Sequence, residues 1–135
     1  GVRFVHNLAP YREATAELLG LCDPLVVNEH EAADLAAALG EQTSTPDGLL
    51  AGLAKHCRSV VITLGGDGAV YASAAGTGGR RSERVEVVDT TGAGDAFVGA
   101  AAASLLTDDD LGRACAAGVA AGAAAVQHRG AQPPL

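Results

Sequence analysis

Hydrophobic and polar residues alternate along this chain in two different patterns. Short runs rich in valine, isoleucine and leucine predict strands, and longer segments with apolar residues at helical intervals predict helices. The strands are expected at Val2–Val5, Leu25–Val27, Ser59–Leu64, Ala69–Ala72 and Val85–Val88. The helices are expected at Tyr11–Leu21, at Ala32–Leu39, from Thr45-Pro46-Asp47 through an apolar stripe that ends at Ala54, at Ala96–Leu106 and at Leu111–Val126.

The order strand, helix, strand at the start of the chain implies a crossover between parallel strands. Proline is expected to interrupt regular structure at Asn7–Pro10 and at Asp23-Pro24. Glycine-rich segments predict a tight turn at Gly65–Gly68 and a mobile connection at Ala74–Ser82. The pattern as a whole predicts an α/β domain with a mostly parallel sheet.

The composition is typical of one globular domain. The chain has 135 residues, of which 48% are hydrophobic and 19% charged, and its formal net charge is −7. The arginines are dispersed except for Arg80-Arg81, interpreted as a solvated pair on a loop, so no nucleic-acid partner is expected. No apolar run reaches the length of a membrane span, and we expect a cytoplasmic protein without a membrane partner.

Two further features concern the extent of the chain and its cysteines. The sequence contains no methionine, and we expect it to be part of a longer product that begins inside a domain. Cys22, Cys57 and Cys115 are odd in number, lie far apart and lack the spacing of metal ligands. Buried, reduced thiols are therefore the expected state.

The stretch Val85–Phe97 combines a short valine-rich strand, a glycine-rich turn and the start of a helix. Unpaired amides and the helix dipole allow such a turn to hold an anion, here through the N–H groups of Gly92, Ala93 and Gly94. Asp95 follows in the first helical turn, where a carboxylate can take the proton of a hydroxyl that attacks a phosphoryl group. A second interpretation stays open, because an acidic residue stabilises a helix N-terminus by about 0.3–1 kcal/mol without any catalytic role.

Two other segments have a local structural explanation. Asn28 and Glu31 have the spacing of a capping box, in which each side chain binds the backbone amide of the other residue. The segment Gly65-Gly66-Asp67-Gly68 has the composition of a hairpin turn between two strands. From the residues alone, these structural roles are the simpler explanation.

The segment Asp-Thr-Thr-Gly-Ala-Gly-Asp-Ala-Phe, which begins at Asp89, closely resembles the C-terminal signature of the ribokinase-like (PfkB) family of carbohydrate and nucleoside kinases. The resemblance implies that Asp95 is the catalytic base and contacts the sugar hydroxyl. It also implies that the amides of Gly92, Ala93 and Gly94 form the anion hole for the γ-phosphoryl group.

Two further motifs match the family in the same order along the chain. The pair Asn28 and Glu31 resembles its Asn-x-x-Glu motif, which implies that Asn28 acts near the nucleotide phosphates and that Glu31 binds Mg²⁺ through its waters. The segment from Thr63 to Gly68 resembles a loop that contacts the nucleotide. The implied ATP-binding residues are Asn28, Thr63, Gly65, Gly66, Asp67, Gly68 and Gly94.

The end of the chain resembles the Gly-Ala-Gln-Pro motif of the family, which implies a potassium site next to the anion hole. Pro134 stands where the family commonly has a serine, and this difference removes one hydroxyl ligand from that site. The implied metal ligands are Glu31 for Mg²⁺ and Asp89, Thr91, Ala125, His128 and Gly130 for K⁺.

Together these matches imply a ribokinase-like three-layer α/β/α fold, in which residues 1–135 form the C-terminal nucleotide-binding and catalytic part. The N-terminal part, which supplies the sugar-binding residues and the lid in this family, is absent. The implied reaction is ATP-dependent phosphorylation of a sugar hydroxyl, with D-ribose as the expected small-molecule partner and ATP, Mg²⁺ and K⁺ as cofactors. A homodimer would form through the missing lid region. Two alternatives are an adenosine-type nucleoside kinase and a truncated ATP-binding module that is inactive alone.

Overall fold

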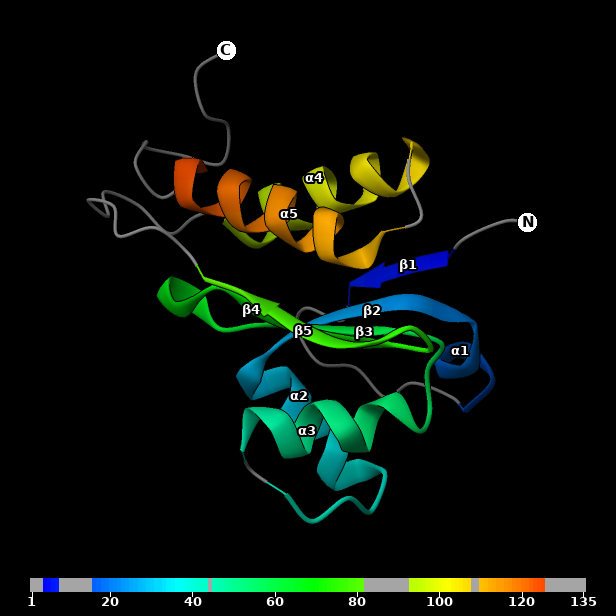
Figure 1. The fold of residues 1–135 in the computed structure, drawn as a ribbon. Helices are drawn as coiled ribbons and strands as arrows, with labels where there is room; N and C mark the ends of the chain where they lie inside the picture. The colour runs from blue at the N-terminus through cyan, green and yellow to red at the C-terminus, as the bar shows by residue number, and fades with distance from the viewer. Residues whose placement is uncertain (1–3, 8–15, 44, 82–92, 108–109, 126–135) are drawn as a thin grey trace. The chain divides into compact units, whose positions relative to one another are not determined.

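The computed structural model describes residues 4–7, 16–43, 45–81, 93–107 and 110–125 (Figure 1). The chain divides into two compact units. The first comprises Gly1–Gly65 and Val70–Gly78, and the second comprises Gly66–Ala69 and Gly79–Leu135. None of the described helices is long and apolar enough to cross a membrane.

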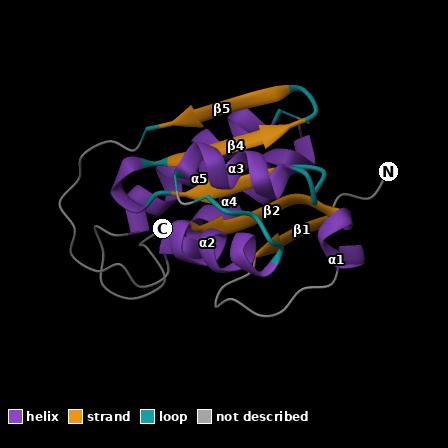
Figure 2. Ribbon diagram, turned by 90° about the horizontal axis from the view of Figure 1, so that it is seen from below, coloured by secondary structure: helices purple, strands orange, loops and turns teal. Residues whose placement is uncertain are grey.

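A five-stranded sheet has the strand order β1-β2-β3-β4-β5. β1 pairs with β2 in parallel and β2 pairs with β3 in parallel, which agrees with the predicted crossover topology. β4 and β5 run in opposite directions and form a hairpin (Figure 2). The strands are β1 (Phe4–Asn7), β2 (Cys22–Asn28), β3 (Val60–Thr63), β4 (Ala69–Ser73) and β5 (Gly76–Arg80).

Local capping residues determine where several helices begin and end. α3 begins after Thr45, whose Oγ1 accepts a hydrogen bond from the Gly48 amide at 3.1 Å, and Pro46 occupies its first turn, where an N–H group is not needed. Gly40 follows α2 with a φ of +82°, which suits glycine at a helix end. The helices are α1 (Ala16–Leu21), α2 (Glu29–Ala38) and α3 (Pro46–Ala54) in the first unit, and α4 (Ala93–Thr107) and α5 (Leu111–Ala125) in the second.

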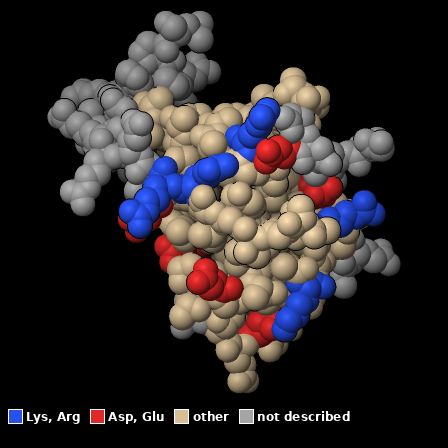
Figure 3. Space-filling model, in the orientation of Figure 1, with Lys and Arg blue, Asp and Glu red and all other residues tan. Residues whose placement is uncertain are grey.

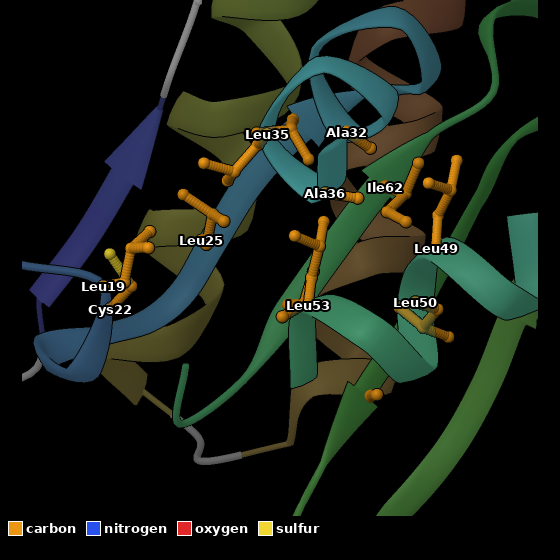
Figure 4. Close-up of a cluster of buried hydrophobic side chains, with 13 residues drawn as sticks. Leu19, Cys22, Leu25, Ala32, Leu35, Ala36, Leu49, Leu50, Leu53 and Ile62 are labelled. Atoms are coloured by element: carbon orange, nitrogen blue, oxygen red, sulfur yellow. The ribbon is translucent and has the colours of Figure 1, made fainter. Parts of the chain in front are cut away.

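The core of the first unit lies between β2, β3 and the helices α2 and α3 (Figure 4). Leu25 and Val27 of β2 and Val60 and Ile62 of β3 are at most 1% exposed. Alternate residues of a strand share one face, so these four side chains form a continuous apolar surface. Each fully buried side chain of this size stabilises the fold by about 1.5–3 kcal/mol. The leucines that the helices pack against this surface are Leu35, Leu49, Leu50 and Leu53.

The second unit is built on the contact between α4 and α5. The Phe97 ring of α4 lies against Gly118 of α5, where a Cβ atom would come within 2.9 Å of the ring. Arg80 Nε donates a hydrogen bond to the Gly112 carbonyl oxygen, in the first turn of α5, at 3.2 Å. Burial raises the pKa of the Cys115 thiol to about 12, so this thiol stays protonated at neutral pH.

Two expectations about interruptions of the fold are wrong. The segment Gly76–Arg80, part of the expected mobile connection Ala74–Ser82, forms β5, because an edge strand needs backbone hydrogen bonds to one neighbour and no apolar periodicity. Arg80 accordingly lies in a strand, not on a loop, and donates a hydrogen bond to α5, although Arg80 and Arg81 are both exposed as expected. Pro24 lies inside β2, where the register with β1 shifts, and such an irregularity tolerates a residue without an N–H group.

Several element ends also differ from the expectation. Asn7 belongs to β1 and not to the following loop. α2 begins at Glu29, earlier than its apolar pattern suggests, because the residue before it caps the helix. α4 begins at Ala93 instead of Ala96, because Gly94 takes part in the first helical turn. Residues 11–15 and the expected strand at 85–88 lie outside the described residues.

Candidate active site

Asn28 and Thr63 are the last residues of β2 and β3, and they are partners in the parallel register of these strands. Thr63 Oγ1 donates a hydrogen bond to the Val27 carbonyl oxygen at 3.4 Å. The carboxyl ends of neighbouring parallel strands are where open α/β sheets bind ligands. The structure therefore brings together two predicted nucleotide contacts that are far apart in the sequence.

Asn28 and Glu31 form the predicted capping box at the start of α2. The Glu31 amide donates to Asn28 Oδ1 at 2.7 Å, and the Asn28 amide donates to Glu31 Oε1 at 2.9 Å. Asn28 is exposed, whereas Glu31 is only 5% exposed. Because Asn28 Oδ1 is occupied by the helix, the side-chain NH₂ group is the part of Asn28 that can donate to an anion.

The glycine-rich turn after β3 contains two glycines with positive φ, Gly65 at +60° and Gly68 at +99°, separated by Gly66 and the exposed Asp67. A Cβ atom at Gly68 would collide with the Arg80 carbonyl group. At Gly65 no described atom lies within 4 Å of the Cβ position. Backbone conformation therefore accounts for both glycines even without a nucleotide.

Helix α4 begins with Ala93, Gly94 and Asp95, whose backbone amides have no acceptor within the helix. Asp95 lies in the first helical turn, as predicted, and both Asp95 and Gly94 are exposed. Among the described residues, nothing lies within 4 Å of a Cβ atom built at Gly94. Gly122 of α5 lies beside this turn, since its Cβ position is 3.5 Å from the Ala93 carbonyl oxygen. The start of α4 thus packs against α5, while no other described residue crowds Gly94.

Ala125 ends α5 and is 1% exposed. Carbonyl groups in the last turn of a helix lack acceptor partners within it, which suits a cation ligand. Within the described ranges, no group of three or more His, Cys, Asp or Glu side chains is arranged to hold a metal ion. The predicted residues that lie outside the described ranges are Asp89, Thr91, Gly92, His128 and Gly130, together with Pro134.

The predicted site residues fall in both units. One supporting contact was not predicted: Phe97, the last residue of the signature segment that begins at Asp89, packs on Gly118. The small residues of α5 indicate close helix packing but not its partner. The first unit contains Asn28, Glu31, Thr63 and Gly65, and the second contains Gly66, Asp67, Gly68, Ala93, Gly94, Asp95 and Ala125.

Charged side chains of both signs are interspersed on the face shown in Figure 3. One cluster joins the end of α2 to the end of α3: Lys55 Nζ lies 3.3 Å from Glu41 Oε2, and His56 Nε2 lies 3.4 Å from Glu41 Oε1. The hydrogen bonds from Lys55 and His56 lower the pKa of the Glu41 carboxyl group. The charged residues of this cluster therefore bind one another and need no ligand to explain them.

Comparison with known proteins covers the chain almost completely. Residues 2–135 match the family of pfkB family carbohydrate kinases. The chain is 36% identical to a ribokinase of Staphylococcus aureus over 137 residues, which cover 100% of this chain and 45% of that protein. It is 37% identical to a ribokinase of Schizosaccharomyces pombe over 139 residues, which cover 97% of this chain and 43% of that protein. The chain therefore spans less than half the length of these relatives.

Solved structures agree with the sequence comparison. A ribokinase of Thermotoga maritima superposes with a TM-score of 0.85 at 28% identity, over 93% of this chain and 42% of that one. An adenosine kinase of Sinorhizobium meliloti superposes with a TM-score of 0.80 at 27% identity, over 95% of this chain and 38% of that one. A ribokinase II of E. coli in complex with ATP and Mg²⁺ superposes with a TM-score of 0.71 at 36% identity, over 86% of this chain and 36% of that one. The chain has the ribokinase-like α/β fold and belongs to the pfkB family of carbohydrate kinases.

Proposed function

We propose that this chain is the C-terminal nucleotide-binding and catalytic part of an ATP-dependent sugar kinase that converts D-ribose to ribose 5-phosphate. The observation that carries the proposal is the start of α4, where Gly94 and Asp95 are both exposed in the first helical turn. Family membership supports the kinase activity, and the ribokinases among the relatives support ribose as the acceptor.

In this proposal the start of α4 carries the chemistry. Asp95 removes the proton of the attacking sugar hydroxyl, and the hydroxyl oxygen forms a bond to the γ-phosphorus of ATP. The bond from that phosphorus to the bridging oxygen breaks, and ADP leaves. The backbone amides of Gly92, Ala93 and Gly94 stabilise the negative charge on the transferred group. The proton remains on the Asp95 carboxylate until solvent removes it.

Asn28 and Glu31 carry the groups that suit a hydrated Mg²⁺ ion beside the nucleotide phosphates. Mg²⁺ prefers oxygen ligands and keeps several of its waters, so one carboxylate is sufficient to hold it. When bound, it neutralises charge on the phosphates. The capping box fixes the Glu31 carboxylate and uses the Oδ1 atom of Asn28. In this proposal the Asn28 NH₂ group donates to a phosphate oxygen.

A monovalent cation fits the end of α5 in the same scheme. The Ala125 carbonyl group lies in the last turn of α5, where the helix dipole favours positive charge. Pro134 lacks the hydroxyl that a serine would add, so the proposed K⁺ site has one ligand fewer than is common in the family. The other proposed ligands are Asp89, Thr91, His128 and Gly130.

We expect Glu31→Gln to raise the Mg²⁺ concentration required for half-maximal activity by about tenfold or more. Glutamine keeps an oxygen that accepts from the Asn28 amide, so the free energy of unfolding should change by less than about 1 kcal/mol. Magnesium titrations of activity and urea unfolding measure the two effects. Glu29→Gln, the same change at an exposed residue of the same helical turn, is the control. A normal Mg²⁺ requirement in Glu31→Gln would contradict the proposed metal contact.

We expect Gly94→Ala to raise the free energy of unfolding by about 0.5–1 kcal/mol, because the helix favours alanine and no described atom lies within 4 Å of the Cβ position. Turnover should nevertheless fall by about tenfold to a hundredfold, because the methyl group occupies the approach of the phosphoryl oxygens to the amides. Steady-state kinetics and urea unfolding test both effects. Gly99→Ala, at another exposed and uncrowded position of α4, should stabilise equally without loss of turnover. If Gly94→Ala also keeps full turnover, the proposed anion hole is wrong.

A nucleoside acceptor is the second candidate, because an adenosine kinase is among the structural neighbours. We further propose that the full-length protein has sugar-binding residues, a lid and a dimer contact outside this chain. They would correspond to the part of the relatives that this chain does not span. On that basis the chain alone binds ATP but turns it over slowly or not at all.

The deciding experiment measures ADP release from ATP and Mg²⁺ with ribose, fructose, adenosine or no acceptor, with and without K⁺. It is performed with this chain and with the full-length protein that contains it. Ribose-dependent release by the full-length protein supports the ribokinase proposal, and adenosine-dependent release replaces it with a nucleoside kinase. ATP binding without acceptor-dependent release from either protein would show a binding module.

A further inference from the structure

Two cysteines that are far apart in the sequence meet in the first unit. Cys22 is the first residue of β2, is fully buried and points into the apolar core beside Leu19 (Figure 4). Cys57 lies between α3 and β3, is partly exposed and packs against the same core. The expectation of three buried thiols is therefore wrong for Cys57.

Backbone hydrogen bonds hold the two segments side by side. The amides of Arg58 and Ser59 both donate to the Cys22 carbonyl oxygen, at 3.0 and 3.4 Å, and the Leu25 amide donates to the Ser59 carbonyl oxygen at 2.9 Å. Ser59 Oγ adds a hydrogen bond of 2.6 Å to Asp23 Oδ1. The Arg58 amide that binds the Cys22 carbonyl is next to Cys57 in the chain, so the two cysteine backbones are neighbours. Neighbouring strands lie about 4.7–4.9 Å apart, a spacing within the Cα range of about 4.4–6.8 Å that disulfides require.

The two thiols also contact each other directly. A hydrogen bond joins the Cys22 and Cys57 side chains, so the sulfur atoms face one another. The S–H group of Cys57 donates to the sulfur of Cys22, which lowers the pKa of Cys22 and raises that of Cys57. A thiolate next to a second thiol is the arrangement from which a disulfide forms.

We propose that Cys22 and Cys57 are an oxidisable pair that forms an intramolecular disulfide with a low-molecular-weight disulfide such as oxidised glutathione. The partly exposed Cys57 sulfur attacks one glutathione sulfur while its proton passes to Cys22 along the S–H···S contact, and one glutathione thiolate leaves. That glutathione thiolate takes the proton from Cys22. The Cys22 thiolate then attacks the Cys57 sulfur in the mixed disulfide, forms the Cys22–Cys57 bond and displaces the second glutathione. The protein is oxidised by two electrons, and one oxidised glutathione becomes two reduced molecules.

The bond joins the amino-terminal ends of two neighbouring parallel strands. Cys22 begins β2 and Cys57 shortly precedes β3, whereas Asn28 and Thr63 end these strands. The disulfide would form at the amino-terminal end of β2, and the capping box lies at its carboxyl-terminal end. Oxidation should therefore leave the capping box in place. We therefore expect the disulfide to stabilise the first unit, with a rise in Tm of about 10 °C.

The test uses trypsin, because each cysteine lies in its own tryptic peptide: residues 13–55, 56–58 and 114–129. The native protein is incubated with oxidised glutathione near pH 8, quenched in acid, alkylated and digested. The expected product is peptide 13–55 linked to peptide 56–58, with Cys115 recovered in its alkylated form. Differential scanning fluorimetry with and without reductant measures the shift in Tm.

Cys57→Ser should abolish both the linked peptide and the shift in Tm. Cys115→Ser, the matched control in the second unit, should retain both. Oxidation in denaturant should instead give a mixture of disulfides among the three cysteines, without a preference for Cys22–Cys57. Three alkylated cysteines after native oxidation, stable glutathione adducts on Cys57, or equal pairing with Cys115 would each overturn the proposal.

Discussion

Replacement of Asp95 by asparagine should lower turnover by about two to four orders of magnitude while ATP binds nearly as tightly as before. Asparagine has almost the same shape but cannot take a proton from the attacking hydroxyl at neutral pH. Because Asp95 is exposed in the first turn of α4, the substitution should disturb no packed side chain among the described residues. Steady-state ADP release by the full-length protein and ATP titration measure the two quantities separately.

A matched control separates catalysis from helix stability. Asp47 is also exposed in the first turn of a helix, α3, so Asp47→Asn removes the same charge from an equivalent position. Both substitutions should destabilise the protein by about 0.3–1 kcal/mol through the helix dipole, and only Asp95→Asn should reduce turnover. Equal activity in the two variants would show that Asp95 only stabilises the helix end, and another base would have to be found.

The largest expected loss of stability comes from Gly68→Ala, at about 3 kcal/mol or more. The backbone at Gly68 has a φ of +99°, which costs an alanine about 1–3 kcal/mol. In addition, the new Cβ atom collides with the backbone carbonyl group of Arg80, and crowding of this kind costs about 1–3 kcal/mol. Urea unfolding measures the loss.

Gly65→Ala is the control for the collision, because its φ of +60° is also positive but no described atom lies within 4 Å of the Cβ position. We expect a cost of about 1–2 kcal/mol from backbone strain alone. Similar losses in both variants would show that the turn relaxes around residue 68. Because Gly68→Ala should distort the turn, a loss of activity in that variant would not identify Gly68 as a nucleotide contact.

Local patterns predicted the parts of the fold that depend on neighbouring residues. The Asn28 and Glu31 capping box and the Thr45 cap before Pro46 are short-range devices, and each lies where its spacing indicates. Asp95 likewise lies in the first turn of a helix, as the order of glycines and alanines implies. The catalytic and metal roles of these residues remain predictions that need a ligand or a kinetic measurement.

Contacts between distant segments were not predictable in the same way. β5 consists of three glycines, Thr77 and Arg80, without an apolar pattern, and it forms because β4 provides backbone hydrogen-bond partners. The approach of Cys22 to Cys57 depends on the pairing of β2 with the segment before β3. Phe97 meets Gly118 only after α4 and α5 have packed. Sequence periodicity specifies which residues are buried in such cases, but not what they contact.

The identity of residue 94 can indicate whether selection acts on the proposed function or only on folding. Asn28 and Glu31 form a capping box, so a substitution that removes its hydrogen bonds destabilises the fold even when no substrate is turned over. Folding does not retain Gly94 in the same way, because the helix favours alanine and no described atom lies within 4 Å of its Cβ position. If the proposed kinase reaction is no longer needed in a descendant, that descendant should therefore keep the capping box and lose Gly94 early. Among diverging relatives, alanine at this position would mark the proteins that have given up catalysis.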